Sequence, residues 1–182
     1  MPRAPDPRLE KNLIEAALRL LDEEGLESVT MRSVAARAGT TTPTLYERFA
    51  DRKALLAAVV EKAEAELIAA VQSAGTVRAF ATAYIRFASQ HSRRFDLTVD
   101  TFQARLASSQ PTPVFDLLRE VIALETRMHG RSLEDMALAI ISLLIGTTRG
   151  MIAARLDHRR AGDLQRACLS ALRLLLNEFR DN

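Results

Sequence analysis

The sequence is poor in the residue types on which disulfide scaffolds and metal centres depend. Its single cysteine, Cys168, excludes an intramolecular disulfide, which favours a reducing compartment such as the cytoplasm. The three histidines, His91, His129 and His158, are scattered and lack the carboxylate or cysteine spacing of a metal or catalytic site. We also find no nucleophile constellation, no phosphate-binding glycine loop and no paired carboxylates. The sequence therefore predicts neither an enzyme nor a metal or cofactor site.

Long apolar runs are missing as well. The most apolar stretch, residues 137–145, is too short to span a bilayer. The amino-terminal stretch MPRAPDPRL has no apolar signal core. We therefore expect a soluble, cytoplasmic protein without a membrane partner.

The sequence is rich in helix-forming residues and has few glycines and prolines. The chain has 182 residues, of which 48% are hydrophobic, so it can bury a substantial core in one large or two small domains. Apolar residues recur at three- and four-residue spacing in residues 9–24, and a wide apolar stripe follows residues 52–73. Further helices are expected at residues 31–38, 42–48, 76–91, 92–106, 114–128, 132–156 and 163–179. We predict an all-α fold of about nine helices.

Several interruptions are expected in the second half of the chain. The helix at residues 92–106 should be irregular near residues 96–101, and Gly130 should end the next helix. Residues 108–113 form the clearest loop, and residues 157–162 should form a turn before the last helix.

The chain is organised around residues 30–53. Thr30 is a good N-cap for a short helix that Gly39 closes, and Thr41 can cap a second short helix. Small hydroxylated residues keep the start of this second helix slim and polar, as entry into a DNA major groove about 12 Å wide requires. This pattern predicts a helix-turn-helix that places its second helix in the major groove.

Charge is distributed unevenly around this motif. Residues 9–27 carry two basic and six acidic side chains, a net charge of −4. Residues 29–56 carry five basic and two acidic side chains, a net charge of +3, although the whole chain has only +2. The motif is thus locally basic, which suits contacts with phosphates. Residues 1–8, with three prolines and two arginines, are either a disordered terminus or a basic arm laid along DNA.

Residues 13–56 resemble the TetR family of bacterial one-component transcriptional regulators. The resemblance rests on the stretch IEAALRLLDEEGLESVTMRSVAARAGTTTPTLYERFADRKALL. Two positions depart from the commonest family form. Arg48 stands where a histidine often precedes the phenylalanine, and Arg52 stands where a lysine usually opens the fourth helix. Both keep or add positive charge, so they bear on base preference and not on DNA binding itself.

The resemblance implies a set of DNA-contacting residues. They are Thr30, Arg32, Thr41, Thr42, Thr44, Tyr46, Arg48 and Arg52. The two residues at the start of the first helix, together with Tyr46 and Arg52, would hold phosphates. The three threonines after Gly39 would face the groove, and Arg48 would contact the backbone or a base. A plainer reading remains open, in which the threonines form only a polar surface and Tyr46 lies at the edge of the core.

The stretch at residues 136–145 is apolar on nearly every side, so it must be covered all round. We expect a second copy of the chain to cover one face, with the last two helices of each copy forming a four-helix bundle. A central core helix within one subunit is the alternative.

The resemblance also implies an effector cavity among the remaining helices. Its candidate lining is Phe80, Tyr84, Phe87, Phe102, Leu106, Phe115, Leu118, Ile122 and Arg149. Plain core packing is the competing reading for each of them. Residues 1–54 would then form the DNA-binding domain and residues 55–182 the effector-binding and dimerisation domain. The sequence favours a homodimeric repressor that releases its operator DNA when a mainly apolar small molecule binds. The alternative is a DNA-binding regulator controlled by protein partners.

Overall fold

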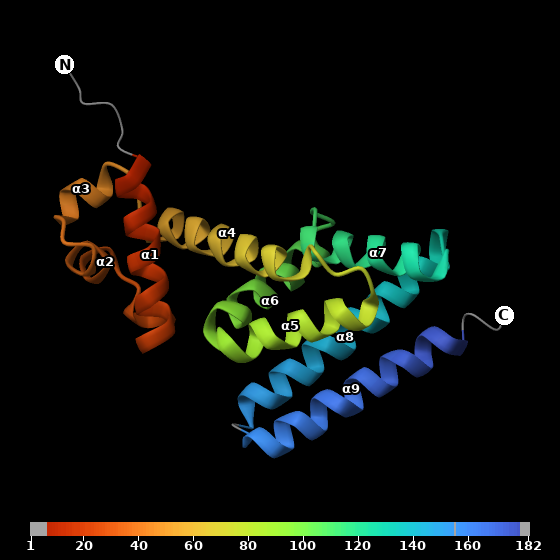
Figure 1. Ribbon diagram of the computed structural model, residues 1–182. Coiled ribbons are helices and arrows are strands. Elements are labelled where there is room, and N and C mark those ends of the chain that lie inside the picture. Colours follow the sequence, from red (N-terminus) through yellow and green to blue (C-terminus); the bar gives the residue numbers. More distant parts are fainter. Residues whose placement is uncertain (1–6, 155, 179–182) are drawn as a thin grey trace. The chain divides into compact units, whose positions relative to one another are not determined.

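The computed structural model describes residues 7–154 and 156–178, so most of the possible basic arm at residues 1–8 lies outside it. Within those ranges the chain is helical and contains no strand, which confirms the all-α prediction (Figure 1). The elements are α1 (Pro7–Glu24), the 3₁₀ helix η1 (Leu26–Ser28), α2 (Met31–Arg37), α3 (Thr42–Tyr46), α4 (Arg52–Val71), α5 (Val77–Gln90), α6 (Ser92–Ala107), α7 (Pro113–Thr126), α8 (Gly130–Ala153) and α9 (His158–Glu178).

Contacts divide the chain into two compact units, Met1–Glu64 and Ala65–Asn182. The division falls inside α4, because the first half of that helix belongs to the first unit. Leu55, Val59 and Ala63 in this half are fully buried. The boundary expected between residues 54 and 55 separates a DNA-binding domain from an effector-binding domain by function, whereas the division described here is by contacts. The functional boundary stays a prediction.

The first unit is built on the amphipathic face of α1. Of the residues spaced for burial on that helix, Leu9 is half-buried and the others are buried, and Leu18 joins them; the buried set is Leu13, Ala16, Ala17, Leu18, Leu20 and Leu21. Short helices α2 and α3 pack in sequence, with α1 against α2 and α2 against α3. Val34 and Leu45 are both fully buried and anchor these two helices in the core. The core therefore fixes α3 although that helix is only five residues long.

The second unit is arranged around α5. Its residues contact α6, α7, α8 and α9, and α8 lies beside both α7 and α9 (Figure 1). Its largest fully buried side chains are Phe80, Ile85, Phe95, Leu118, Ile122, Ile140, Leu144 and Leu172. Cys168 is buried in the same core, as expected of a structural thiol.

The expected irregularity near residues 96–101 is wrong, because α6 is continuous there. Two threonine hydroxyls of this helix donate hydrogen bonds to backbone carbonyls of the same helix. Thr98 Oγ1 donates to Phe95 O at 2.8 Å, and Thr101 Oγ1 donates to Leu97 O at 2.9 Å. Such back-bonding removes the need for a break.

Two predicted helix ends are also wrong. Arg127, with φ 60°, is the left-handed residue that ends α7, whereas Gly130 opens α8. The expected turn at residues 157–162 is largely the first turn of α9. Asp157 caps that turn, since its Oδ1 accepts from Arg160 N at 2.8 Å.

Within the described residues, α8 is the one helix long and apolar enough to cross a membrane by length and composition. It has 24 residues and a mean hydropathy of 1.7 in its most apolar window, so the sequence estimate from residues 137–145 was too narrow. The core helix of a soluble protein passes the same test, and Ile140 and Leu144 lie in the core. Only 39% of the window is buried, however, and Leu138, Leu143 and Ile145 are partly buried.

Candidate nucleic-acid interface

The start of α2 is fixed by a capping box. Thr30 Oγ1 accepts from Ser33 N at 3.1 Å, and Ser33 Oγ accepts from Thr30 N at 3.0 Å. The sequence indicated Thr30 but not Ser33, because a capping box usually places Glu or Gln at that position. The two reciprocal bonds fix the start of the helix, where Arg32 is exposed.

The connection to α3 is a tight turn at Gly39, whose φ of +68° is the left-handed conformation that glycine adopts without strain. Thr41 Oγ1 lies 2.9 Å from Thr44 Oγ1 and accepts from Thr44 N at 3.4 Å, so it caps α3 as predicted. The helix ends at Tyr46, two residues earlier than expected.

The predicted DNA-contacting residues all belong to the first unit and differ in exposure. Thr30, Arg32, Thr41 and Tyr46 are exposed, and the other four are half-buried. Tyr46 is 52% exposed, which argues against a place at the edge of the core. Because Leu45 is fully buried beside it, α3 is anchored on one side and presents the tyrosine on another.

Arg52 is already engaged within the first unit. Its Nε donates to Val29 O at 2.7 Å and its Nη2 donates to Leu26 O at 2.8 Å. The side chain therefore ties the start of α4 to the link that precedes α2. Its Nη1 makes no such bond, so a phosphate contact there is compatible with the tie. We call this pair of hydrogen bonds the Arg52 tie.

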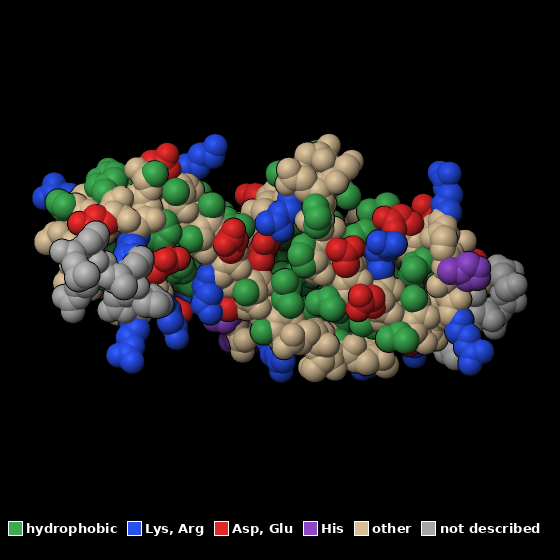
Figure 2. All heavy atoms as spheres, turned by 90° about the horizontal axis from the view of Figure 1, so that it is seen from above, with side chains coloured by type: hydrophobic (Ala, Val, Ile, Leu, Met, Phe, Trp, Pro, Cys, Tyr) green, Lys and Arg blue, Asp and Glu red, His purple; other side chains and the backbone are tan. Residues whose placement is uncertain are grey.

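Two further arginines change the charge pattern expected from sequence. Arg37 pairs with Glu23 at 2.7 Å and with Glu24 at 3.1 Å, so part of the local positive charge is neutralised by α1. Arg48 is half-buried, and its Nε is buried without a hydrogen-bond partner. On the face drawn in Figure 2, basic and acidic side chains are interspersed.

The candidate effector residues lie in the second unit. Those at 0–5% exposure are Phe80, Tyr84, Phe87, Phe115, Leu118 and Ile122. Phe102 is partly buried against the same core, whereas Leu106 is 47% exposed. Their burial is the arrangement that core packing predicts, and an effector contact by any of them stays a prediction.

Arg149, the charged member of that set, faces two carboxylates of α6. Its guanidinium pairs with Asp100 and lies 3.8 Å from Asp96. Burial raises the pKa of Asp96, an effect that Arg149 opposes and Asp100 reinforces. Burial also raises the pKa of the Tyr84 hydroxyl, again against the influence of Arg149.

The part of the chain that the structure describes contains no group of three or more His, Cys, Asp or Glu residues placed to hold a metal ion. The starts of α2, α3 and α4 carry hydroxyl and guanidinium groups. These are donors suited to phosphates and base edges.

Residues 13–59 match the family described as bacterial regulatory proteins, tetR family. The chain is 44% identical over 54 residues to the tetracycline repressor protein class A from transposon 1721 of Escherichia coli, which covers 30% of this chain and 25% of that relative. The chain thus spans about a quarter of the length of this relative.

Solved structures share the fold over nearly the whole chain. One is a tetR-family transcriptional regulator from Streptomyces coelicolor, with a TM-score of 0.77, 18% identity and coverage of 96% of this chain and 83% of that chain. Another is BioQ with its double-stranded DNA operator, with a TM-score of 0.61, 19% identity and coverage of 95% and 98%. These likenesses establish the fold, and the match at residues 13–59 identifies its first domain. Residues 13–59 therefore form a domain of the tetR family of bacterial regulatory proteins.

Proposed function

We propose that this protein is a homodimeric transcriptional repressor that binds double-stranded operator DNA and releases it when a small molecule binds the second unit. The observation that carries the proposal is the first unit itself, in which a capped α2, a tight turn and a capped α3 present exposed hydroxyl and guanidinium groups. The place of action is the bacterial cytoplasm. The family is one of regulators and not of enzymes.

The proposed contacts follow from donor chemistry. Arg32 is exposed at the start of α2 and supplies charge to a phosphate. Tyr46 supplies a neutral hydroxyl, and the threonines of α3 face the groove. Neutralising a phosphate releases counterions, whereas a neutral hydroxyl does not, so the two kinds of contact have different salt dependence. Relatives support this role: one is named a tetracycline repressor, and BioQ was solved with its operator.

The proposed dimer uses α8 and α9. Leu138, Leu143 and Ile145 of α8 are only partly buried in the single chain, and Leu174 of α9 is 64% exposed. A two-fold pairing of these helices would bury both surfaces in a four-helix bundle. Two α3 helices could then occupy successive major grooves, about 34–36 Å apart in B-DNA.

The proposed effector is a mainly apolar small molecule held by the second unit. The tight burial of Phe80, Leu118 and Ile122 is an observation in favour of the alternative, in which protein partners control the regulator. The two functions differ in one respect that can be measured. A small molecule alone should weaken DNA binding in the first case and have no effect in the second.

The experiment is fluorescence anisotropy of the purified protein with labelled duplex from the intergenic region beside its own gene, repeated over a range of salt concentrations. Tyr46→Phe should weaken binding roughly 10-fold, the value of one charge-assisted hydrogen bond, at an unchanged salt slope. Arg32→Gln should instead reduce the salt slope by about 0.9, the value for one phosphate contact. Arg78→Gln, which removes an exposed arginine of α5 in the second unit, is the matched control.

Binding without salt dependence, or wild-type affinity for both variants, would contradict the proposal. Both side chains are exposed, and neither makes a side-chain hydrogen bond to another described residue, so both variants should have melting temperatures within a few degrees of that of the wild type. A larger loss of melting temperature would mean that the side chain is structural.

A further inference from the structure

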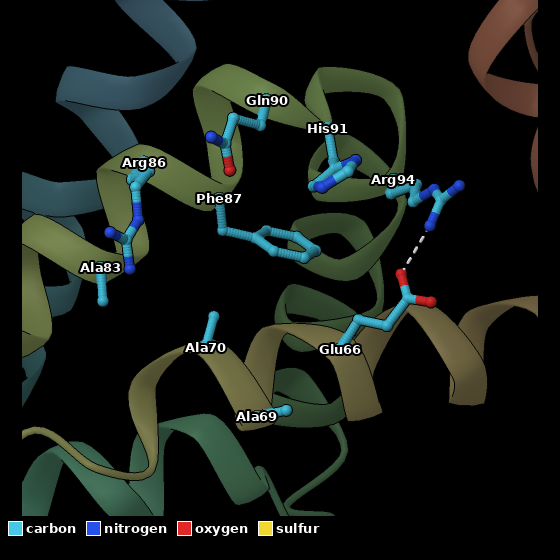
Figure 3. Close-up of a pocket in the computed structure, with 9 residues that line it drawn as sticks. All are labelled: Glu66, Ala69, Ala70, Ala83, Arg86, Phe87, Gln90, His91 and Arg94. Carbon is cyan, nitrogen blue, oxygen red and sulfur yellow. Dashed lines mark hydrogen bonds and ion pairs between the residues drawn. The ribbon is translucent and has the colours of Figure 1, made fainter.

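A groove of about 600 Å³ lies on the second unit, between the end of α4, α5 and the start of α6 (Figure 3). Its apolar floor comes from Ala69 and Ala70 of α4 and from Ala83 and Phe87 of α5. In Figure 3 the Phe87 ring points into the space between these helices. The volume falls within the range of small-molecule sites, about 300–1,000 Å³.

An ion pair closes one side of this groove. Arg94 Nη1 of α6 lies 2.6 Å from Glu66 Oε2 of α4. The side chains are 13% and 24% exposed, so the pair is better shielded from solvent than an ordinary surface pair. It joins α4 to α6 across the groove, as the dashed line in Figure 3 marks.

The opposite side carries a cation that has no partner. Arg86 of α5 is exposed and makes no hydrogen bond or ion pair with any described residue. Gln90 follows one helical turn later on the same face, so its amide can donate to the same group. In the view of Figure 3, the Phe87 ring lies between Arg86 and the Glu66–Arg94 pair.

We infer that this groove binds a small organic anion, a carboxylate on an apolar body. The body would lie on the alanine and phenylalanine floor, and the carboxylate would pair with Arg86. Glu66 is already matched by Arg94, so the unmatched charge in the groove is positive and disfavours a cation. A neutral ligand would fill the floor but leave the guanidinium of Arg86 without a partner.

The anion also has a second possible partner in Arg94. A ligand carboxylate that reaches this guanidinium competes with Glu66 for it and weakens the link between α4 and α6. This step rests on the proposed function, since it makes the groove the effector site. It names the chemistry of the effector as anionic, where the sequence indicated only an apolar molecule.

The test is calorimetric titration of the full-length protein, without DNA, with octanoate, octanol and octylamine, which share an alkyl chain and differ in charge. Octanoate should bind at least about 10-fold more tightly than the other two, the value of one charge-assisted hydrogen bond. Arg86→Gln should remove that advantage. Arg78→Gln, two turns earlier on α5 and outside the groove lining, should keep it. Glu66→Gln, which removes the competing carboxylate, should raise octanoate affinity several-fold.

Equal affinity for the three probes, or octanoate binding unchanged by Arg86→Gln, would overturn the inference. Because the titration contains no DNA, its result is independent of whether the protein binds an operator. The same variants are then assayed with the intergenic duplex. Octanoate that binds through Arg86 and lowers DNA affinity supports the groove as effector site. Octanoate that binds through Arg86 and leaves DNA affinity unchanged supports the groove and overturns its regulatory role.

Discussion

Replacing Arg52 should loosen the first unit even when positive charge is retained. The Arg52 tie connects the start of α4 to the carbonyls of Leu26 and Val29 through two separate nitrogens. Leu26 O also accepts from Val29 N at 3.2 Å, so it keeps a partner when Arg52 is removed. Val29 O accepts no other hydrogen bond from the residues that the structure describes, so it loses its partner. A lysine ammonium is a single point donor, whereas the guanidinium places two donors in a rigid fork.

The magnitude follows from the two bonds. Hydrogen bonds to a charged group contribute about 1.5–3 kcal/mol each when shielded, and this side chain is half-buried. We therefore expect Arg52→Met to lower the free energy of unfolding by about 2 kcal/mol, and Arg52→Lys by about half of that. At roughly 2–4 °C per kcal/mol for a chain of this size, Arg52→Met should melt about 4–8 °C below wild type.

Thermal denaturation followed by circular dichroism measures this loss. Lys53→Met is the matched control, because it removes a neighbouring exposed cation that makes no hydrogen bond or ion pair with its side chain to any described residue. The melting temperature of this control should equal that of the wild type. An Arg52→Lys protein that also melts with the wild type would refute the Arg52 tie. If Arg52→Met then reduced the salt slope of DNA binding by about 0.9, Arg52 would be a phosphate contact alone.

Two further outcomes are expected. Leu174→Glu should convert the protein from a dimer to a monomer of 20.1 kDa in light scattering, because Leu174 lies on α9 in the proposed interface. The control Leu124→Glu changes an 80% exposed leucine of α7 and should stay dimeric. A dimeric Leu174→Glu protein and a monomeric Leu124→Glu protein would exclude this interface. Burial raises the pKa of Asp96 in the folded state, so ionising this carboxyl destabilises the folded wild type. The free energy of unfolding of Asp96→Asn should therefore increase relative to that of wild type as the pH rises above about 4. Urea unfolding at several pH values measures the difference, and a constant difference would contradict that sign.

The local features of the fold were predictable because their causes are local. Thr30 and Thr41 were expected to cap helices, and each accepts a hydrogen bond from the amide three residues later, as Thr76 also does at the start of α5. The buried face of α1 follows from apolar spacing alone. The ends of α7 and α8 were not predictable in this way, since Arg127 takes the left-handed conformation that glycine usually occupies.

The interactions that change the interpretation of the site join residues far apart in the chain. Arg52 bonds to a carbonyl 23 residues away, and Arg94 pairs with a carboxylate 28 residues away. No spacing rule distinguishes these arginines from others that remain exposed, such as Arg32 and Arg86. The sequence therefore identified which residues could contact DNA, but not that Arg52 is held by backbone carbonyls.

Both of these long-range contacts involve α4. Arg52 at its first residue bonds to the link that precedes α2, and Glu66 in its second half pairs with α6. Between them the helix contains no glycine or proline. An anion that takes Arg94 from Glu66 would remove an ion pair between α4 and α6. A ligand acts through differential affinity for two states, so the states here would differ in whether Glu66 or the ligand holds Arg94.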